Sequence, residues 1–341
     1  MIRSPDAPLT VAAVVICFNQ DRFLAAALEG LRHQTRPPDQ VILVDDCSTD
    51  GSQATLRAWA AEHRPDAVLV FHEVNQGVTR TLNEAFTLVS CDLVAPLAGD
   101  DVWLPGKLQL QLAHFAQLPE QVGVLYGDVD QIDEHGGLLP ERFIAANKGR
   151  HLHPEGALFL ELLQGNFLPS PSLLLRRACW EQVGHFDESL YMEDWDFWLR
   201  VAQHYDFAYS PYDVAQYRVV SGSHVSRKGP TVLESHLATL LKWSHTPELR
   251  HREVQAIVRS LAGALITEGS SRYRRRRLAW LWVHNGGLGF WVRGRPGYAG
   301  RRSRAVRLRL RQARTRTGPP TTPPASPPAS PPETDLNVFP R

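Results

Sequence analysis

The sequence predicts an α/β fold in which a mostly parallel sheet carries helices on both faces. Three observations lead to this prediction. Short, almost wholly apolar runs recur along the first hundred residues, as expected for strands that are buried on both faces. Segments with apolar side chains at helical spacing separate these runs. The connections between them are short, which is typical of strand and helix units alternating around one sheet.

Four apolar runs in the first part of the chain have the length of buried strands. They cover residues 11–18, 40–44, 67–72 and 93–97. Three segments of helical spacing alternate with these runs. They cover residues 21–33, 52–63 and 79–89. Strands that follow one another through a helix predict parallel pairing with crossover connections.

The pattern is less regular after Trp103. Further helices are expected at residues 108–116, 177–183 and 194–204, and further strands at residues 122–130 and 172–175. Residues 136–165 are irregular, with a short helix expected near their end, and residues 232–267 predict two helices divided near Thr246 and Pro247. Two halves of one domain, residues 1–102 and 103–228, are therefore expected to precede a helical extension.

Composition sets the C-terminal part of the chain apart. Residues 229–317 form an Arg-rich extension, and residues 318–341 contain a Thr, Ser, Pro and Ala tract at 319–332 that predicts a disordered tail. From Arg250 to Arg316 there are 18 arginines and two acidic residues, whereas the remainder carries 19 basic and 34 acidic side chains. An acidic body and a basic arm are expected to meet different partners.

Cysteine usage and the absence of targeting signals predict a cytoplasmic protein. The four cysteines are scattered and form no metal-binding pair, so that reduced core thiols are expected. Residues 1–10 lack the pattern of a secretory signal. The apolar run at residues 278–292 is interrupted by His284 and Asn285 and is too short to span a bilayer.

Polar residues follow three of the predicted strands at the point where each strand ends. Asn19 follows the first run, Asp45 and Asp46 end the second, and Asp100 and Asp101 follow the fourth. In parallel sheets the ligand binds beyond the carboxyl ends of the strands. The sequence therefore predicts a ligand site that contains these side chains.

The first acidic pair suits the recognition of a nucleoside. A carboxylate at the end of a strand can accept hydrogen bonds from the imide N–H of a uracil or thymine ring, or from ribose hydroxyls. A turn does not require two adjacent acidic residues such as Asp45 and Asp46. Asp50, in contrast, is interpreted as a helix-capping residue. We therefore expect the pair to contact a nucleotide.

The second acidic pair suits a divalent metal ion. Asp100 and Asp101 follow an apolar strand and Gly99, and two adjacent carboxylates repel each other unless a cation or hydrogen-bond donors offset their charge. Mg²⁺ or Mn²⁺ with oxygen ligands fits such a site when a diphosphate completes the coordination. A solvated acidic turn is the alternative interpretation.

A third acidic pair begins a predicted helix. Glu193 and Asp194 precede the aromatic side chains of Trp195 and Trp198. Acidic residues stabilise the positive end of a helix dipole, so that structure alone could explain them. A general base also needs a carboxylate held among apolar walls, which the two tryptophans could supply.

Taken together, these segments resemble the family-2 glycosyltransferases. The resemblance covers residues 10–225 and rests on motifs in the same order as in that family. They are VVICFN at residues 14–19, VDDCSTDGS at 44–52, NQG at 75–77 with Asn83, GDDVWLPGKL at 99–108, and GHFD at 184–187 followed by Glu193 and Asp194. The resemblance implies the GT-A fold, a Rossmann-like sheet with helices on both faces, and an inverting transfer from a nucleotide-sugar.

The resemblance also implies roles for the residues of the first half. Asp46 would contact the base of the donor, with Asp45 beside it. The remaining nucleotide-binding residues would be Asn19, Asn75, Gly77 and Asn83. Asp100 would hold Mg²⁺ or Mn²⁺ on the donor diphosphate, with Asp101 close by.

In the second half the resemblance assigns the chemistry to the third acidic pair. Asp194, with Glu193 beside it, would deprotonate the acceptor hydroxyl for direct attack on the anomeric carbon. Two departures from the family pattern matter. Ala98 stands where the family usually has another metal-binding acid, and the segment after Tyr217 and Arg218 lacks the usual His. His224 could replace it, and Arg218 could pair with phosphate.

The basic arm leaves three partners open. Five arginines lie between Arg272 and Arg277, and Trp280 and Trp282 follow them. Such an arm suits peripheral contact with an anionic membrane on its cytoplasmic face, and the many family members that act on lipid carriers favour this interpretation. A partner subunit is an alternative, and nucleic acid is disfavoured because no binding module accompanies the arm.

The expected function is sugar transfer from a UDP-, dTDP- or GDP-sugar to a glycan or lipid-linked acceptor, in the assembly of cell-surface polysaccharide, lipopolysaccharide or glycoprotein. A nucleotidyltransferase would explain two acidic pairs, but it would need a Gly-rich basic loop after the first strand, and Phe18 and Asn19 offer none. A degenerate nucleotide-sugar-binding module is the other alternative. Ala98 favours that alternative, and the intact third pair speaks against it.

Overall fold

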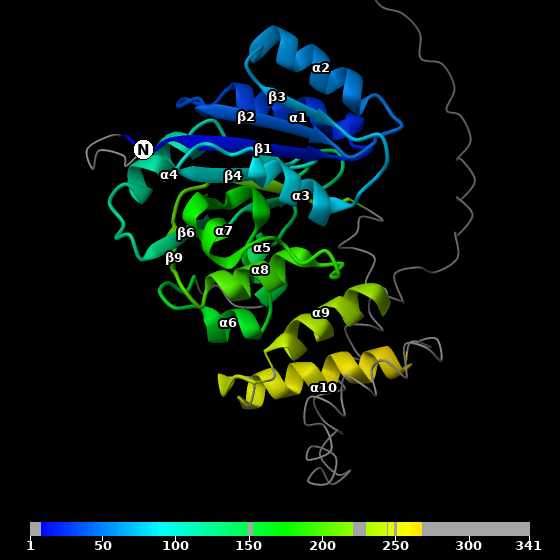
Figure 1. Cartoon of the computed structure of the whole chain (residues 1–341), viewed down its shortest axis with the longest axis vertical. Coiled ribbons are helices and arrows are strands. Elements are labelled where there is room, and N and C mark those ends of the chain that lie inside the picture. The colour runs from blue at the N-terminus through cyan, green and yellow to red at the C-terminus, as the bar shows by residue number, and fades with distance from the viewer. Residues whose placement is uncertain (1–7, 149–152, 221–229, 244, 249–250, 268–341) are drawn as a thin grey trace, which may run out of the picture. The chain divides into compact units, whose positions relative to one another are not determined.

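A computed structural model describes residues 8–148, 153–220, 230–243, 245–248 and 251–267 (Figure 1). Several predicted features lie outside these residues. They are His224, the arginines and tryptophans of the basic arm beyond residue 267, and the Pro-rich tract at 319–332.

A seven-stranded sheet forms the centre of the molecule. Its order is β3 (Val68–Phe71), β2 (Gln40–Asp45), β1 (Val11–Cys17), β4 (Leu93–Ala98), β8 (Leu174–Arg176), β6 (Val122–Gly127) and β9 (Asp206–Ser210). The strands β1 to β4 are parallel, β8 is antiparallel to both of its neighbours, and β6 and β9 are parallel to each other. The predicted α/β class with a mostly parallel sheet is confirmed.

Alternate residues of the central strands face two different cores. Val14 and Val44 belong to one apolar cluster, and Val15 and Leu43 belong to the other. Because both faces are buried, the strands read as continuous apolar runs in the sequence. The two halves expected on either side of residue 102 share this sheet, since β8 pairs with β4.

Helices cover both faces of the sheet. The first core packs against α3 (Val78–Thr87), α6 (Phe159–Leu163), α7 (Arg177–Val183) and α8 (Glu193–Val201), and the second against α1 (Asp21–Arg32), α2 (Ser52–His63) and α4 (Lys107–Phe115). A short helix, α5 (Phe143–Lys148), follows the helix α4 in the chain. Two further helices, α9 (Pro230–Lys242) and α10 (Arg252–Thr267), pack against each other. Their division agrees with the break predicted near Thr246.

A small second sheet was not predicted from the sequence. It consists of β5 (Val102–Trp103), β10 (Ala215–Arg218) and β7 (Asp130–Ile132). The strand predicted at residues 122–130 is in fact divided between β6 and β7. The division occurs at Asp128, whose Oδ1 accepts hydrogen bonds from the N–H groups of Val129 and Ile144 (2.9 and 3.0 Å) and so turns the chain.

Lys107 of the GDDVWLPGKL segment is completely buried at the start of α4. Its Nζ donates to Gln111 Oε1 (2.7 Å) and to the carbonyl of Leu173 (3.2 Å). Burial lowers the pKa of this amine well below its usual value, because a charged ammonium is costly to remove from water. The side chain therefore ties α4 to the segment before β8 rather than presenting a charge to a ligand.

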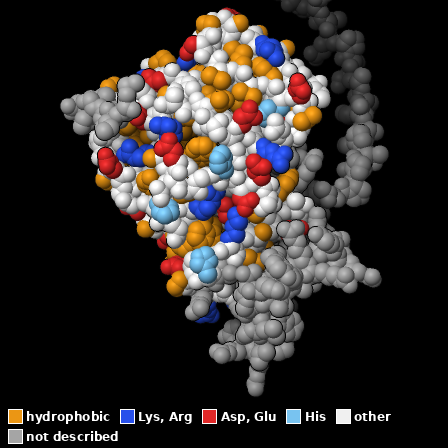
Figure 2. Space-filling view, in the orientation of Figure 1, with side chains coloured by type: hydrophobic (Ala, Val, Ile, Leu, Met, Phe, Trp, Pro, Cys, Tyr) orange, Lys and Arg blue, Asp and Glu red, His pale blue; other side chains and the backbone are white. Residues whose placement is uncertain are grey.

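On the surface, charges of both signs lie close together over the face shown in Figure 2. Arg80 and Glu188 are one such exposed pair, with 2.8 Å between Nε and Oε2. Pairs of this kind contribute little to stability, since water screens them. Within the described part of the chain, no helix has both the length and the apolar character needed to cross a bilayer.

Candidate active site

Side chains from two of the three predicted acidic pairs lie near one tyrosine of the second sheet, Tyr217. Burial raises the pKa of the Tyr217 phenol, and the carboxylates of Asp101, Asp100 and Asp194 raise it further. Asp100 follows β4 and Asp194 begins α8, so that the fold joins residues almost a hundred positions apart. Acidic side chains thus gather beyond the carboxyl end of the parallel strands, where ligands bind in such sheets.

The first pair ends β2 and is buried. Asp45 Oδ1 accepts hydrogen bonds from the N–H of Ser48 and from Gln53 Nε2 (both 2.8 Å), which fixes the turn into α2. Asn19 holds the same turn from the end of β1. Its backbone N–H donates to Ser48 Oγ, and its Oδ1 accepts from the N–H of Thr49 (both 2.8 Å). These contacts join two of the predicted nucleotide-binding segments into one structure.

Asp46 organises the loop between β3 and α3. Its Oδ1 accepts from the N–H of Gln76 (2.7 Å), and its Oδ2 accepts from the N–H of Gly77 (2.8 Å). Asn75 Nδ2 donates to the Asp46 carbonyl (3.0 Å). Gly77 has a φ of 86°, a backbone conformation that favours glycine. Asp46 therefore shapes the loop predicted to line the nucleotide pocket, and its contact with a base stays a prediction.

Asn83 was expected to line that pocket, but its contacts give it a different role. Its side chain is buried, its Nδ2 donates to the carbonyl of Phe186 (3.1 Å), and its Oδ1 accepts from the N–H of the same residue (2.8 Å). Both ends of the amide are occupied by the backbone of a segment more than a hundred residues away. Asn83 thus anchors the segment that leads into α8.

Asp100 is partly accessible and follows a glycine that is closely surrounded. A Cβ at Gly99 would lie 2.8 Å from Gln20 Oε1 and 3.2 Å from a Leu24 methyl group, so that a larger residue would displace the Gln20 side chain. Burial raises the pKa of Asp100, and a hydrogen bond from Gln20 and the charge of Arg218 oppose that rise. Gly99 thus lets the acidic turn lie against the end of β1.

The donor set at Asp100 fits a divalent ion only in combination with a substrate. Among the described residues, no three His, Cys, Asp or Glu side chains are arranged to hold a metal by themselves. Mg²⁺ is commonly bound by one or two carboxylates together with substrate phosphates. Asp100 is a hard oxygen ligand of this kind, and Ala98, which lacks a ligand atom, leaves the protein contribution small.

Asp101 and Arg218 brace the acidic turn against the second sheet. Asp101 Oδ1 accepts from the backbone N–H of Arg218 (2.9 Å). The guanidinium donates from Nε to the Asp100 carbonyl (2.8 Å) and from Nη1 to the Asp133 carbonyl (3.0 Å). The side chain is buried, and the phosphate contact expected for Arg218 stays a prediction. Burial, and then the charge of Asp100, raise the pKa of Asp101 well above its usual value.

The third pair begins α8, as predicted. Asp194 is partly accessible, its Oδ1 accepts from the N–H of Trp195, and its Oδ2 accepts from Asn166 Nδ2 (both 2.7 Å). Burial, followed by the charge of Asp194, raises the pKa of Glu193 to about 8. Burial also raises the pKa of Asp194. Near neutral pH the folded protein therefore keeps Glu193 largely in its protonated, neutral form.

A hollow of about 200 Å³ lies beside this pair. Asn166, the hydrogen-bond partner of Asp194, forms part of its wall. The other lining residues are Asn147, Glu161, Gln164, Gly165, Phe167 and Ile257. Amide and carboxylate groups with one aromatic side chain give the hollow a polar, hydrogen-bonding character.

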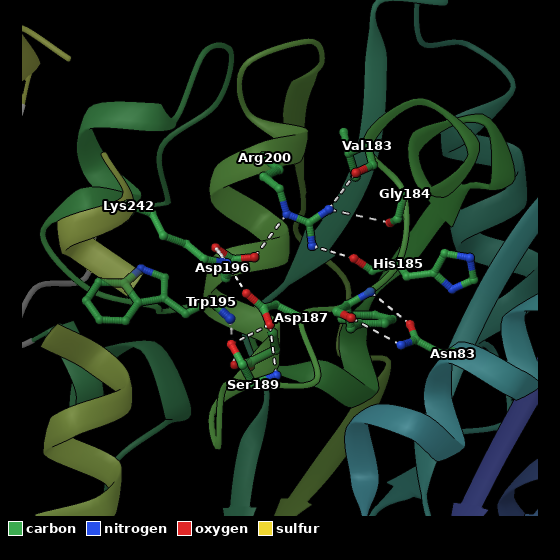
Figure 3. A network of polar contacts seen from close by, with 12 residues as sticks. Asn83, Val183, Gly184, His185, Asp187, Ser189, Trp195, Asp196, Arg200 and Lys242 are labelled. Carbon is green, nitrogen blue, oxygen red and sulfur yellow. Dashed lines mark hydrogen bonds and ion pairs between the residues drawn. The ribbon is translucent and has the colours of Figure 1, made fainter. Parts of the chain in front are cut away.

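A network of charges holds α8 in place (Figure 3). Asp196 is completely buried, its Oδ2 accepts from Arg200 Nε (3.0 Å), and its Oδ1 accepts from Lys242 Nζ (2.9 Å). Arg200 also donates to the carbonyls of Val183 and His185 (2.6 and 2.8 Å). The network therefore ties α8, α9 and the segment after α7 together two residues beyond Asp194.

Replacing Asp196 with asparagine is expected to destabilise the protein by roughly 2–3 kcal/mol, because two cations lose their buried counter-charge. Urea unfolding of the variant measures the change. Glu181→Gln is a suitable control, since Glu181 pairs with Arg177 on the surface (2.7 Å) and its loss is expected to cost less than about 0.5 kcal/mol. Equal stabilities of the two variants would contradict this account of the network.

Glu193 predicts a dependence of stability on pH. Its folded-state pKa of about 8 exceeds the ordinary value of 4.5, so that between these values the folded protein binds more protons than the unfolded chain. The free energy of unfolding therefore falls as the pH rises through this window, by no more than about 1.4 kcal/mol per pH unit. Glu193→Gln is expected to flatten this decline in unfolding experiments at pH 5 and pH 8. Parallel curves for the two proteins would show the prediction to be wrong.

The mostly parallel sheet with helices on both faces is the GT-A fold. TarS of Staphylococcus aureus, solved with UDP-GlcNAc, has this fold with a TM-score of 0.54 at 16% identity, covering 80% of this chain and 84% of that one. Residues 12–181 match the family model described as Glycosyl transferase family 2. The chain belongs to this family.

Curated relatives agree with this assignment. An uncharacterized glycosyltransferase of Nostoc sp. is 30% identical over 52% of this chain and 54% of the relative. The amylovoran biosynthesis glycosyltransferase AmsE of Erwinia amylovora is 28% identical over 52% of this chain and 63% of the relative. The chain thus spans about half the length of the first relative and 33% of another, from Rickettsia felis.

Three residues of the site were not identified from the sequence. Asn166 lies in a segment without a readable pattern, and Tyr217 was noted only as the neighbour of Arg218. His72 ends a predicted strand three positions before Asn75, and this spacing is the one signal that could have drawn attention to it.

Proposed function

We propose that the protein is an inverting glycosyltransferase that moves a sugar from a UDP-, dTDP- or GDP-sugar to a hydroxyl group of a glycan or lipid-linked acceptor. One observation carries the proposal. Asp100, which can face a diphosphate, and Asp194, which can accept a proton, both lie close enough to Tyr217 to raise its pKa. A single displacement needs two such groups, one at the leaving side and one at the attacking side of the anomeric carbon.

Asp194 is the base in this proposal. It accepts the proton of the acceptor hydroxyl while the oxygen forms a bond to the anomeric carbon, and the bond from that carbon to the diphosphate breaks with inversion. Asn166 and the N–H of Trp195 orient the carboxylate, and the raised pKa of Asp194 makes it a stronger base than a solvated aspartate. No second carboxylate is needed as a nucleophile.

Mg²⁺ or Mn²⁺ would be held by Asp100 together with the donor diphosphate, and it would offset the negative charge on the departing nucleoside diphosphate. The chain itself fixes Asp100 through the contact with Gln20, and it fixes the peptide after it through Arg218. Asp101 helps to fix the turn that carries Asp100, since its carboxylate accepts a hydrogen bond from the backbone N–H of Arg218.

The hollow beside Asp194 is the proposed acceptor side. Hydroxyl groups of a sugar can donate to Glu161 and to the amide oxygens of Asn147 and Gln164. A role in cell-surface polysaccharide assembly agrees with the name of the AmsE relative. Peripheral contact of the basic arm with anionic membranes remains a separate proposal, which liposome flotation with and without anionic lipid would test.

A screen of UDP-, dTDP- and GDP-sugars with Mg²⁺ or Mn²⁺ tests the proposed function. Release of nucleoside diphosphate, with an increase on addition of an acceptor glycan and a loss in EDTA, is the expected result. Release of pyrophosphate from a nucleoside triphosphate would instead indicate a nucleotidyltransferase. If no nucleotide-sugar binds or turns over, the proposed function is wrong.

A further inference from the structure

His72 occupies an unusual position between two carboxylates. It follows β3 directly, its side chain is 3% exposed, and its backbone N–H donates to the Asp45 carbonyl (3.0 Å). Nδ1 lies 2.7 Å from Asp46 Oδ1, and Nε2 lies 2.9 Å from Glu84 Oε2. Asp46 comes from the turn after β2 and Glu84 from α3. The ring therefore connects two elements that flank the predicted nucleotide pocket.

The two contacts select one protonation state of the ring. A neutral imidazole carries one N–H, whereas an imidazolium donates from both nitrogens. Ionised carboxylates only accept hydrogen bonds, so that both contacts are satisfied together when His72 is charged. Each is then a charge-assisted hydrogen bond, and such bonds are stronger than those between neutral groups.

The imidazolium acts on a carboxylate that already orders the pocket. Asp46 Oδ1 is in hydrogen-bond contact with His72 Nδ1 and accepts from the N–H of Gln76, and Oδ2 accepts from the N–H of Gly77. Rotation of this carboxylate would release both backbone groups. Because His72 is itself fixed at its far side by Glu84, it sets the direction of the Asp46 carboxylate and through it the position of residues 75–77.

We propose that His72 is a positioning residue for the donor nucleotide, which holds the loop at residues 75–77 through Asp46 and is itself held in place by Glu84. This inference rests on the proposed function, since it assigns the loop to a nucleoside diphosphate. It predicts that nucleotide affinity depends on a carboxylate of α3 that lies on the outer side of His72. Glu84 is 44% exposed, so that its substitution can be tested in a folded protein.

The test compares Glu84→Gln with Glu73→Gln. Glu73 is an exposed acid between β3 and α3, and its substitution removes the same charge without changing a contact of the ring. Dissociation constants of UDP, dTDP and GDP with Mg²⁺ are measured by calorimetry at neutral pH. Glu84→Gln is expected to weaken binding at neutral pH by about three- to tenfold, as for a lost charge-assisted hydrogen bond. His72→Leu should weaken it by at least as much.

A second pair of variants separates positioning from a general loss of structure. His72→Gln, whose amide can still donate a hydrogen bond to Asp46, should recover part of the affinity that His72→Leu loses, while the two variants should melt at similar temperatures without nucleotide. If Glu84→Gln binds nucleotide with the affinity of Glu73→Gln, the inference is overturned while the proposed function stands. If the wild type binds none of the three nucleotides, the proposed function fails, and the inference with it.

Discussion

Asp194→Asn is expected to lower kcat for sugar transfer by about 10²–10⁴-fold, the usual contribution of a general base. An asparagine keeps the size of the side chain, and its Oδ1 can still accept from the N–H of Trp195 as Asp194 does. It cannot take the proton of the acceptor hydroxyl. The affinity for the nucleotide-sugar should change by less than about threefold, because a base acts on the attacking side of the reaction.

The measurement is the initial rate of transfer at saturating donor, together with the dissociation constant of the donor. Asp206→Asn is a matched control, since Asp206 lies at the amino end of the edge strand β9, whereas the site lies beyond the carboxyl ends of the parallel strands. This variant should retain the wild-type rate. If Asp194→Asn transfers sugar as fast as Asp206→Asn does, Asp194 is not the base.

Asp100→Asn is the second substitution with a large expected effect, a loss of about 10²–10³-fold in kcat/KM. Asn can offer one neutral oxygen to a cation where Asp offers a charged one, so that the metal is held less tightly on the donor diphosphate. Because Ala98 supplies no ligand atom, no neighbouring acid two positions earlier can take over. Raising the Mg²⁺ or Mn²⁺ concentration should recover part of the lost activity.

Asp101→Asn provides the comparison, because Asp101 is adjacent and equally acidic but faces the backbone of Arg218. An asparagine oxygen can still accept that hydrogen bond, and a loss of less than about tenfold without a change in metal dependence is expected. Rates measured across a metal titration decide between the two residues. A metal dependence that shifts in Asp101→Asn and stays unchanged in Asp100→Asn would reverse the assignment.

The sequence alone determined the features of this protein that depend on neighbouring residues. The runs at residues 11–18 and 93–97 predicted buried strands because both faces of a central parallel strand exclude water, and the structure has β1 and β4 there. Asp100 follows its strand directly, so that its place at the carboxyl edge required no knowledge of the fold beyond parallel pairing. The family was recognisable for the same reason, since its motifs are short and local.

Tertiary structure alone decided which distant segments these polar residues hold together. The side-chain amide of Asn83 is hydrogen-bonded to Phe186, and the guanidinium of Arg218 donates to the carbonyls of Asp100 and Asp133. The Asp46 carboxylate contacts His72 and the loop that follows it. A buried polar atom must find a hydrogen-bond partner, but nothing in the local sequence says which distant residue supplies it. The acidic pairs could therefore be found from the sequence, whereas the hydrogen-bond partners of these polar residues come from segments up to 118 residues away.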